Sequence, residues 1–278
     1  MMGAKKEIRV AVIDVNNGSA NQGMRNIMAI LSQYKKEHSL NLSAESFDLR
    51  SKNEIPGIDY DIYISSGGPG SPFEGENEAW EKSFFDLLSH VDLHNAKHNR
   101  KKYVFLICHS FQLACRKYGL GTVTRRKSAS FGIFPVSLTL QGEKDSLYSG
   151  LANPFYAVDS RNWQVLPAGE NSFDQKGAVI LAIEKERPGV DLERCIMSVR
   201  FSAEMAGTQF HPEADPAGMK RYLLEEEKKQ MIIAAAGEKK YTDMLNDLED
   251  PTGILLTRQL VMPNFLNEAV QSLNTSYD

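Results

Sequence analysis

The sequence predicts an α/β protein of three layers, in which helices cover both faces of a mostly parallel sheet. Two observations carry this expectation. Short β-forming runs alternate with helical patterns as far as Tyr118, and chemically reactive side chains follow the ends of these runs. In folds of this kind, functional groups gather at the carboxyl ends of the parallel strands.

The first half of the chain contains four strand patterns and three helical ones. Strands are expected at residues 8–15, 42–47, 61–65 and 103–107, and helices at 24–34, 76–91 and 112–118. The last helix should end at Gly119, since glycine is common just after a helix C-terminus. Tyr118 is followed by a β-rich half, with strands expected at residues 132–140, 155–158, 178–183, 196–201 and 208–210.

A helical segment follows the β-rich half. Helical spacing covers residues 219–236 and returns between 241 and 273. We therefore divide the chain into a domain of residues 1–215 and a helical C-terminal extension of residues 216–278. The extension is expected to pack as a cap on the core, with docking or dimerisation as the alternative; the apolar positions that motivate this are Tyr222, Leu223, Met231, Ile232 and Ile233.

The amino-acid composition limits the kinds of partner that the protein is expected to bind. The 278 residues carry a net charge of −4, which gives no basic field for nucleic acid, and the run Arg125, Arg126, Lys127 is interpreted as a solvated turn. No apolar stretch is long enough to span a membrane. The three cysteines, Cys108, Cys115 and Cys195, suggest neither a disulfide framework nor a zinc site, so we expect a cytoplasmic protein without a metal.

Cys108 lies where a buried strand turns into a helix. Such an elbow lifts a nucleophile clear of the sheet, and the free N–H groups of the helix N-terminus favour a thiolate and a nearby oxyanion. Position alone leaves a small buried core thiol equally plausible, because cysteine is among the most buried residue types.

Two other segments favour the reactive interpretation. The loop Ser65–Pro72 is rich in glycine and follows a strand, so its backbone N–H groups can converge on an anion. The segment Gly207–Glu213 places His211 and Glu213 two residues apart at another strand end. A thiol, a base, a carboxylate that orients the base and a donor loop are the parts of nucleophilic acyl transfer.

These three segments, in this order, resemble the class I (triad) glutamine amidotransferase family, whose fold is flavodoxin-like. Residues 66–71 match the family's Gly-Gly-Pro-Gly loop, residues 209–213 match its Q-F-H-P-E box, and the loop is most similar to that of GMP synthase glutaminase domains. The elbow motif G-x-C-x-G-x-Q keeps Cys108 and Gln112 but has Leu106 and Ser110 in place of the glycines. The likeness covers about residues 8–215.

The resemblance implies a glutaminase that hydrolyses the glutamine side-chain amide without a cofactor. It implies Cys108, His211 and Glu213 as catalytic residues and backbone N–H groups at Gly68 and His109 as the oxyanion site. Gln112 and the segment Ser130, Phe131 and Gly132 would hold the substrate. Many relatives have a histidine where this chain has Arg161, so acceptor coupling or substrate choice is expected to differ.

Two alternatives remain open at this stage. Ile107-Cys108-His109 also resembles the elbow of the peptidase and deglycase branch, in which case the His109 ring would take part in catalysis. A free-standing γ-glutamyl hydrolase is a related possibility, which full turnover without a partner would indicate. Leu106 and Ser110 motivate the other alternative, a non-catalytic glutaminase-like subunit that only binds a partner. A rate measurement separates it from both enzymes.

The chain has parts for ammonia release but none for ammonia use. It contains no G-x-x-x-x-G-K-[ST] loop, so an ATP-dependent synthetase step would belong to another chain. We therefore expect a monomer or small oligomer, such as a homodimer, that is weakly active alone and more active with a synthetase.

Overall fold

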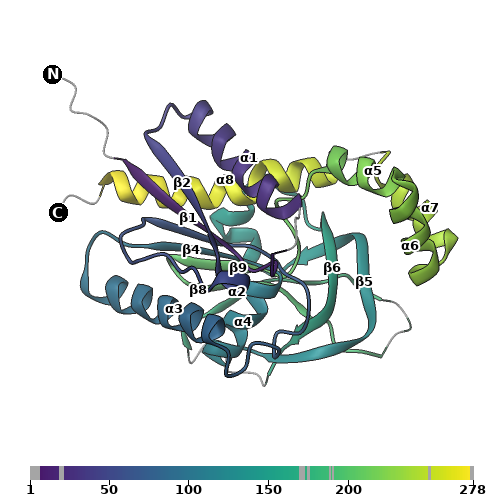
Figure 1. The fold of residues 1–278 in the computed structure, drawn as a ribbon, viewed down its shortest axis with the longest axis horizontal. Helices are drawn as coiled ribbons and strands as arrows, with labels where there is room; N and C mark the ends of the chain where they lie inside the picture. Colours follow the sequence, from purple (N-terminus) through teal and green to yellow (C-terminus); the bar gives the residue numbers. More distant parts are fainter. Residues whose placement is uncertain are drawn as a thin grey trace.

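The computed structural model describes residues 7–18, 22–168, 173, 176–187, 189, 191–249 and 252–275. Within these residues, one sheet has the strand order β2-β1-β3-β4-β9-β8-β7-β5-β6 (Figure 1). The strands are β1 (Ile8–Asp14), β2 (Leu42–Asp48), β3 (Ile62–Ser65), β4 (Tyr103–Ile107), β5 (Thr122–Leu138), β6 (Phe155–Leu166), β7 (Val179–Glu184), β8 (Ile196–Ser202) and β9 (Met205–Thr208).

The helices are α1 (Gln22–Glu37), α2 (Leu49–Lys52), α3 (Ala79–Lys97), α4 (His109–Tyr118), α5 (Pro216–Leu224), α6 (Glu226–Ala236), α7 (Glu238–Asp247) and α8 (Thr252–Thr275). Two short 3₁₀ turns, Gly142–Lys144 and Ser146–Tyr148, follow β5. Gly119 ends α4 in the left-handed conformation, as its position predicts.

The sheet has a parallel half and an antiparallel half. Neighbouring strands from β2 to β9 run parallel, whereas β9, β8, β7, β5 and β6 pair antiparallel. The carboxyl ends of β3, β4 and β9 therefore lie side by side, because parallel neighbours end at the same edge of the sheet. This edge receives the glycine loop, Cys108 and the segment that leads to His211.

Alternate residues of each parallel strand face opposite layers. Val10 and Val12 belong to a core cluster with residues of α1 and α8, and Ala11 and Ile13 belong to a second cluster with residues of α3 and α4. Figure 1 shows α1 and α8 on one side of the sheet and α3 and α4 on the other. The expected three-layer fold is confirmed, and a helix of the C-terminal segment, α8, forms part of one outer layer.

The antiparallel half departs from the expected strand limits. β5 begins at Thr122 and not at residue 132, so the Arg125–Lys127 run lies in a strand and the expected turn was wrong, although Arg125 and Lys127 are exposed as expected. Arg126 places its guanidinium 3.0 Å from the Glu184 carboxylate at the end of β7. This partner is 58 residues away in sequence, so local charge gave no sign of it. The last expected strand, 208–210, is instead β9, which ends at Thr208.

The helix expected at 219–236 is two helices. Glu225 is extended, so α5 ends at Leu224 and α6 begins at Glu226. Leu223 and Ile232 are nine residues apart, which would place them on opposite faces of one helix. The break brings both into one apolar cluster with Tyr241 and Met244 of α7. The apolar positions Tyr222 and Ile233 pack against this cluster, whereas Met231 is exposed. The domain division at residue 215 stays a prediction.

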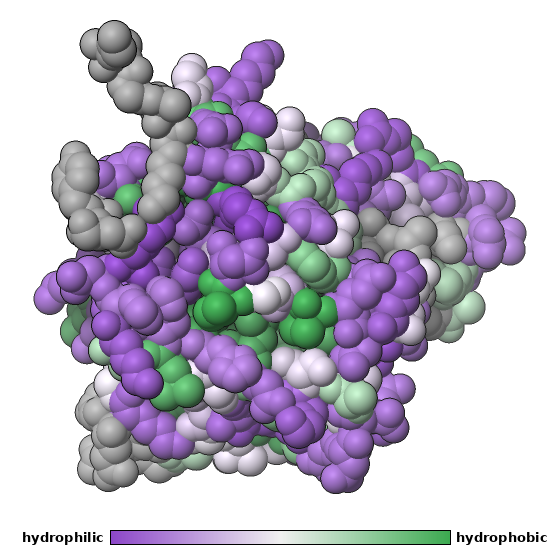
Figure 2. Space-filling view, turned by 60° about the vertical axis from the view of Figure 1, so that its left-hand side comes forward, coloured by the Kyte–Doolittle hydropathy of each residue, from purple (hydrophilic) through white to green (hydrophobic). Residues whose placement is uncertain are grey.

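The surface is mainly hydrophilic on the face that Figure 2 shows, with hydrophobic residues in small separate patches. The helices in the described residues are all too short or too polar to cross a lipid bilayer.

Candidate functional site

Cys108 occupies the sharp turn between β4 and α4. Its backbone has φ 49° and ψ −99°, a conformation that non-glycine residues rarely adopt. The Cys108 N–H donates to the carbonyl of Thr208 at 2.7 Å, and its carbonyl accepts from the Gln112 N–H at 3.0 Å. One bond therefore fixes the Cys108 turn to β9, and the other fixes it to the first turn of α4. The side chain therefore stands at the N-terminus of α4, where free N–H groups favour negative charge.

The glycine loop after β3 lies directly against Cys108. A Cβ on Gly67 would be 2.8 Å from His211 Cε1 and 3.4 Å from Cys108 Cβ. A Cβ on Gly68 would be 2.3 Å from the carbonyl oxygen of Val15. Neither position has room for a side chain, so glycine lets the backbone approach both the sulfur and the imidazole.

His211 and Glu213 follow β9. The His211 N–H donates to the carbonyl of Val158 at 2.9 Å, and Nδ1 lies 2.8 Å from Glu213 Oε1. Burial lowers the pKa of His211, but the charges of Glu213 and Cys108 raise it well above its usual range. The imidazole therefore keeps its proton beside the sulfur. A protonated ring that is oriented by a buried carboxylate stabilises a thiolate and can later protonate a leaving group.

The sequence matches the family described as Glutamine amidotransferase class-I over residues 25–231. The chain belongs to this family. No curated protein matches the amidotransferase.

Three solved structures are similar to this amidotransferase in fold. A glutamine amidotransferase from Thermotoga maritima has 18% identity and a TM-score of 0.65, with 95% of this chain and 98% of that chain covered. One from Methylobacillus flagellatus has 12% identity, a TM-score of 0.67 and coverage of 99% and 98%. A putative GMP synthase protein from Thermoplasma acidophilum has 17% identity, a TM-score of 0.51 and coverage of 75% and 85%.

The amidotransferase replaces both elbow glycines and still closes the elbow. Leu106 is fully buried and pairs with Gly207 on β9. A Cβ on Gly207 would be 3.1 Å from Leu106 Cβ and 3.0 Å from Phe111 Cδ2, so a glycine on the neighbouring strand provides the room. Ser110 Oγ lies 2.6 Å from both the Ser66 carbonyl and Ser65 Oγ, which ties the elbow helix to the loop.

His109 begins α4 and contributes a backbone N–H at the helix N-terminus. Its ring is 1% exposed, and Nε2 has no hydrogen-bond partner within the described residues. The pKa of His109 is lowered to about 3, mainly by burial and further by the charges of Arg50 and Arg116. The ring is therefore neutral at physiological pH.

The expected substrate residues lie on α4 and β5. Gln112 Nε2 donates to Gln209 Oε1 at 3.0 Å and to the Trp163 carbonyl at 3.3 Å. Ser130 and Gly132 lie on β5 opposite Arg161 and Asp159 of β6, and the Ser130 hydroxyl donates to Asp159. Phe131 packs against the α5–α7 cluster. Within the part of the chain that is described, three or more metal-binding side chains do not gather at any point.

Four residues of this site lie outside the set of site residues predicted from the sequence. Gly67, and not only Gly68, touches the cysteine and histidine. Arg50 Nη1 donates to the Pro69 carbonyl at 2.7 Å and braces the loop. Gln209 Nε2 lies 3.7 Å from Cys108 Sγ, and Arg258 of α8 donates to the Glu213 carbonyl at 2.5 Å. Only Gly67 and Gln209 lie inside the recognised motifs, so only these two carried a signal.

Proposed function

We propose that the chain hydrolyses the side-chain amide of glutamine through Cys108, His211 and Glu213. One observation carries the proposal: Gly67 of the donor loop lies against both Cys108 and the His211 ring, whose Nδ1 is held by Glu213 at 2.8 Å. A nucleophile, an acid–base group and backbone donors thus share one small space, as acyl transfer requires.

The reaction has two halves. The Cys108 thiolate attacks the amide carbon, and backbone N–H groups at Gly68 and His109 stabilise the tetrahedral oxyanion. His211 donates its proton to the leaving nitrogen, so ammonia departs and a γ-glutamyl thioester remains. His211 then takes a proton from water, which attacks the thioester and releases glutamate and the thiolate. Gln112 and the backbone of Ser130, Phe131 and Gly132 hold the substrate.

The state of His109 favours this mechanism over the peptidase or deglycase alternative. A neutral ring whose pKa is near 3 is a poor base, and Arg50 and Arg116 oppose its protonation. His211, in contrast, is oriented by a carboxylate. We expect His211→Ala to abolish most ammonia release and Glu213→Gln to reduce it less, whereas His109→Ala should act mildly, because only its backbone is needed.

The decisive experiment measures ammonia release from glutamine by the wild-type chain and by Cys108→Ala. A diazo-ketone analogue of glutamine should label Cys108 alone, as mapped by mass spectrometry. Labelling at Cys115 or Cys195, or equal turnover by Cys108→Ala, would reject the proposal. Turnover that survives His211→Ala but not His109→Ala would support the peptidase-like alternative, and a folded wild type without turnover would support the non-catalytic role.

We further propose that the ammonia passes to an ATP-dependent synthetase on another chain, in the cytoplasm. The absence of a phosphate-binding loop motif from the sequence supports this division of labour. The test is ammonia release with and without synthetases from the same cell; turnover unchanged by every partner would support a free-standing γ-glutamyl or amide hydrolase.

A further inference from the structure

We propose that Gln209 stabilises the Cys108 thiolate through its side-chain amide, with Gln112 and Arg161 as positioning residues behind it. The proposal rests on the glutaminase function and adds a group at the reacting sulfur. Gln209 is fully buried, and its Nε2 lies 3.7 Å from Cys108 Sγ. The sulfur has two other neighbours: the His211 ring, whose charge favours the thiolate, and the Ser160 carbonyl at 3.8 Å, which can only accept a hydrogen bond and so favours the thiol.

The orientation of the Gln209 amide follows from a chain of contacts that begins at a backbone carbonyl. The Trp163 carbonyl can only accept, so the group of Gln112 that lies 3.3 Å from it must be the NH₂. The same NH₂ lies 3.0 Å from the Gln209 amide and requires its oxygen there. The Gln209 NH₂ is then the group that faces the sulfur. An N–H donor stabilises a thiolate more than a thiol, because bonds to charged groups are the stronger ones.

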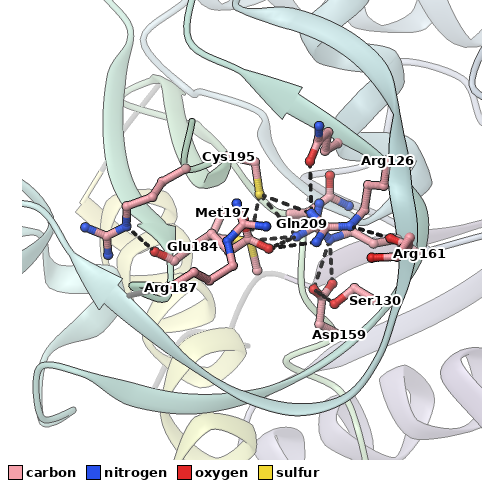
Figure 3. Close-up of polar contacts among 12 residues, drawn as sticks. Arg126, Ser130, Asp159, Arg161, Glu184, Arg187, Cys195, Met197 and Gln209 are labelled. Carbon is pink, nitrogen blue, oxygen red and sulfur yellow. Dashed lines mark hydrogen bonds and ion pairs between the residues drawn. The ribbon is translucent and has the colours of Figure 1, made fainter. Parts of the chain in front are cut away.

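The Trp163 carbonyl is itself held by a buried ion-pair cluster, which Figure 3 shows beside Gln209. Arg161 Nη1 donates to this carbonyl at 3.2 Å, and its Nε pairs with Asp159 at 2.7 Å. Burial lowers the pKa of Arg161, but Asp159, Cys195 and Glu184 raise it by more, so the guanidinium stays charged. Both carboxylates are paired, since Glu184 also contacts Arg126.

This cluster supplies a rigid wall. Arg161 is buried and contacts Asp159, Glu184 and the Trp163 carbonyl, so it cannot move without breaking several contacts at once. The Ser130 hydroxyl adds a bond of 2.7 Å to Asp159 and links the wall to the expected substrate segment. The relay therefore runs from Arg161 through the Trp163 carbonyl, Gln112 and Gln209 to the sulfur.

The test measures the Cys108 thiolate directly and does not require turnover. Iodoacetamide alkylation of the full chain is followed by mass spectrometry across a pH series for wild type, Gln209→Leu and Gln209→Glu. We expect the midpoint of the Cys108 profile to rise by about one pH unit in Gln209→Leu, a tenfold loss of thiolate, and by more in Gln209→Glu. All three cysteines are buried, but Cys108 keeps 4% exposure whereas Cys115 and Cys195 have none. Burial raises the pKa of Cys115 well above its usual range and that of Cys195 to about 11, so both serve as unreactive references.

Gln164→Leu is the matched control. Gln164 Oε1 accepts from Arg126 at 2.9 Å and its Nε2 donates to Thr124 Oγ1 at 3.4 Å, so these bonds join the same cluster without involving Gln112 or Gln209. Its loss should leave the Cys108 midpoint unchanged. Gln112→Leu, which removes the support of Gln209, should raise the midpoint by less than Gln209→Leu, and it provides the test if Gln209→Leu fails to fold.

Steady-state kinetics separate this inference from the proposed function. In Gln209→Leu, kcat should fall about tenfold while KM for glutamine changes less than about twofold. An unmoved midpoint in a folded Gln209→Leu, or an equal shift in Gln164→Leu, would overturn the inference and leave the glutaminase proposal intact. A wild type that releases no ammonia, together with a raised midpoint in Gln209→Leu, would overturn the function and leave the role of Gln209 standing.

Discussion

Ser110 is a single hydroxyl that fixes the donor loop to the elbow. Its Oγ donates to the Ser66 carbonyl at 2.6 Å, and both residues are buried. Ser110→Ala leaves that carbonyl without its partner, so we expect a loss of about 1–3 kcal/mol in the free energy of unfolding. Because a loop displaced by about 1 Å can slow a reaction on the order of a hundredfold, kcat should fall more than KM changes.

Urea unfolding and ammonia release measure the two effects. Ser89→Ala is the control, since Ser89 Oγ donates to the Phe85 carbonyl on α3 and accepts from Lys117 in the last turn of α4, at the opposite end of that helix from Cys108. If Ser110→Ala were less stable but kept the kcat of the wild type, the hydroxyl would contribute to stability alone.

His109 gives stability a pH dependence. Its pKa falls from a usual 6.5 to about 3 in the folded protein. As pH drops below 6.5, the unfolded chain binds a proton here and the folded chain does not, so this group costs about 2 kcal/mol at about pH 5. The loss is complete only near pH 3. Above about pH 7.5, His109 no longer changes the free energy of unfolding, because its ring is neutral in both the folded and the unfolded chain.

His109→Phe should therefore lose less stability than wild type between about pH 7.5 and about pH 5. Urea midpoints at several pH values measure the difference, and the comparison at about pH 7.5 serves as the reference. If the urea midpoints of wild type and His109→Phe fell equally with pH, His109 would not be a source of the pH dependence.

At the scale of elements, α8 supplies an outer layer of the sheet. Phe265 is 1% exposed, and its ring centroid lies 5.0 Å from that of Phe105 on β4. Phe265→Ala should lower the free energy of unfolding by about 3–5 kcal/mol, because the cavity would open against a central strand. Leu255 lies on the same helix at 38% exposure, so Leu255→Ala should change it by less than about 0.5 kcal/mol. Equal losses in the two variants would show that α8 is loosely packed.

The α5–α7 helices offer two adjacent leucines in opposite environments. Leu223 is 1% exposed within their shared cluster, whereas Leu224 is 58% exposed. Leu223→Ala should accelerate amide hydrogen exchange in α6 and α7, because it removes the contact that joins the three helices. Leu224→Ala should leave the amide hydrogen exchange of α6 and α7 unchanged. An equal rise in exchange in Leu223→Ala and Leu224→Ala would show that Leu223 does not hold the three helices together.

At the scale of the whole molecule, one core joins distant parts of the sequence. The cluster that begins at Ile8 on β1 includes Leu273 near the end of α8. Neither segment can leave without exposing the other, so we expect the sheet and α8 to unfold together. Tryptophan fluorescence and far-ultraviolet circular dichroism should give coincident transitions in urea. A separate early transition that removes helix without altering fluorescence would show that α8 unfolds independently.

Local patterns in the sequence predicted the fold class, the strands of the parallel half that precede Cys108 and the segments that converge at the site. These features depend on alternation and spacing, which a single stretch displays. The rest depends on contacts between distant residues: Arg126 lies in a strand because β5 pairs with β6, Gln209 faces the sulfur because of Gln112, and Ser110 matters because of Ser66. No local pattern contains such pairs.

The bond from Arg258 to the Glu213 carbonyl has a consequence for protein synthesis. On the ribosome, Cys108 and His211 are made before residues 252–275, so the nascent chain holds the proposed catalytic residues while the face of β4 that Phe265 of α8 covers is still exposed. The segment that covers this face also anchors the backbone of Glu213. A chain whose translation stops short of α8 would thus lack both the layer and the anchor, so the candidate site would form only after the last helix has been made.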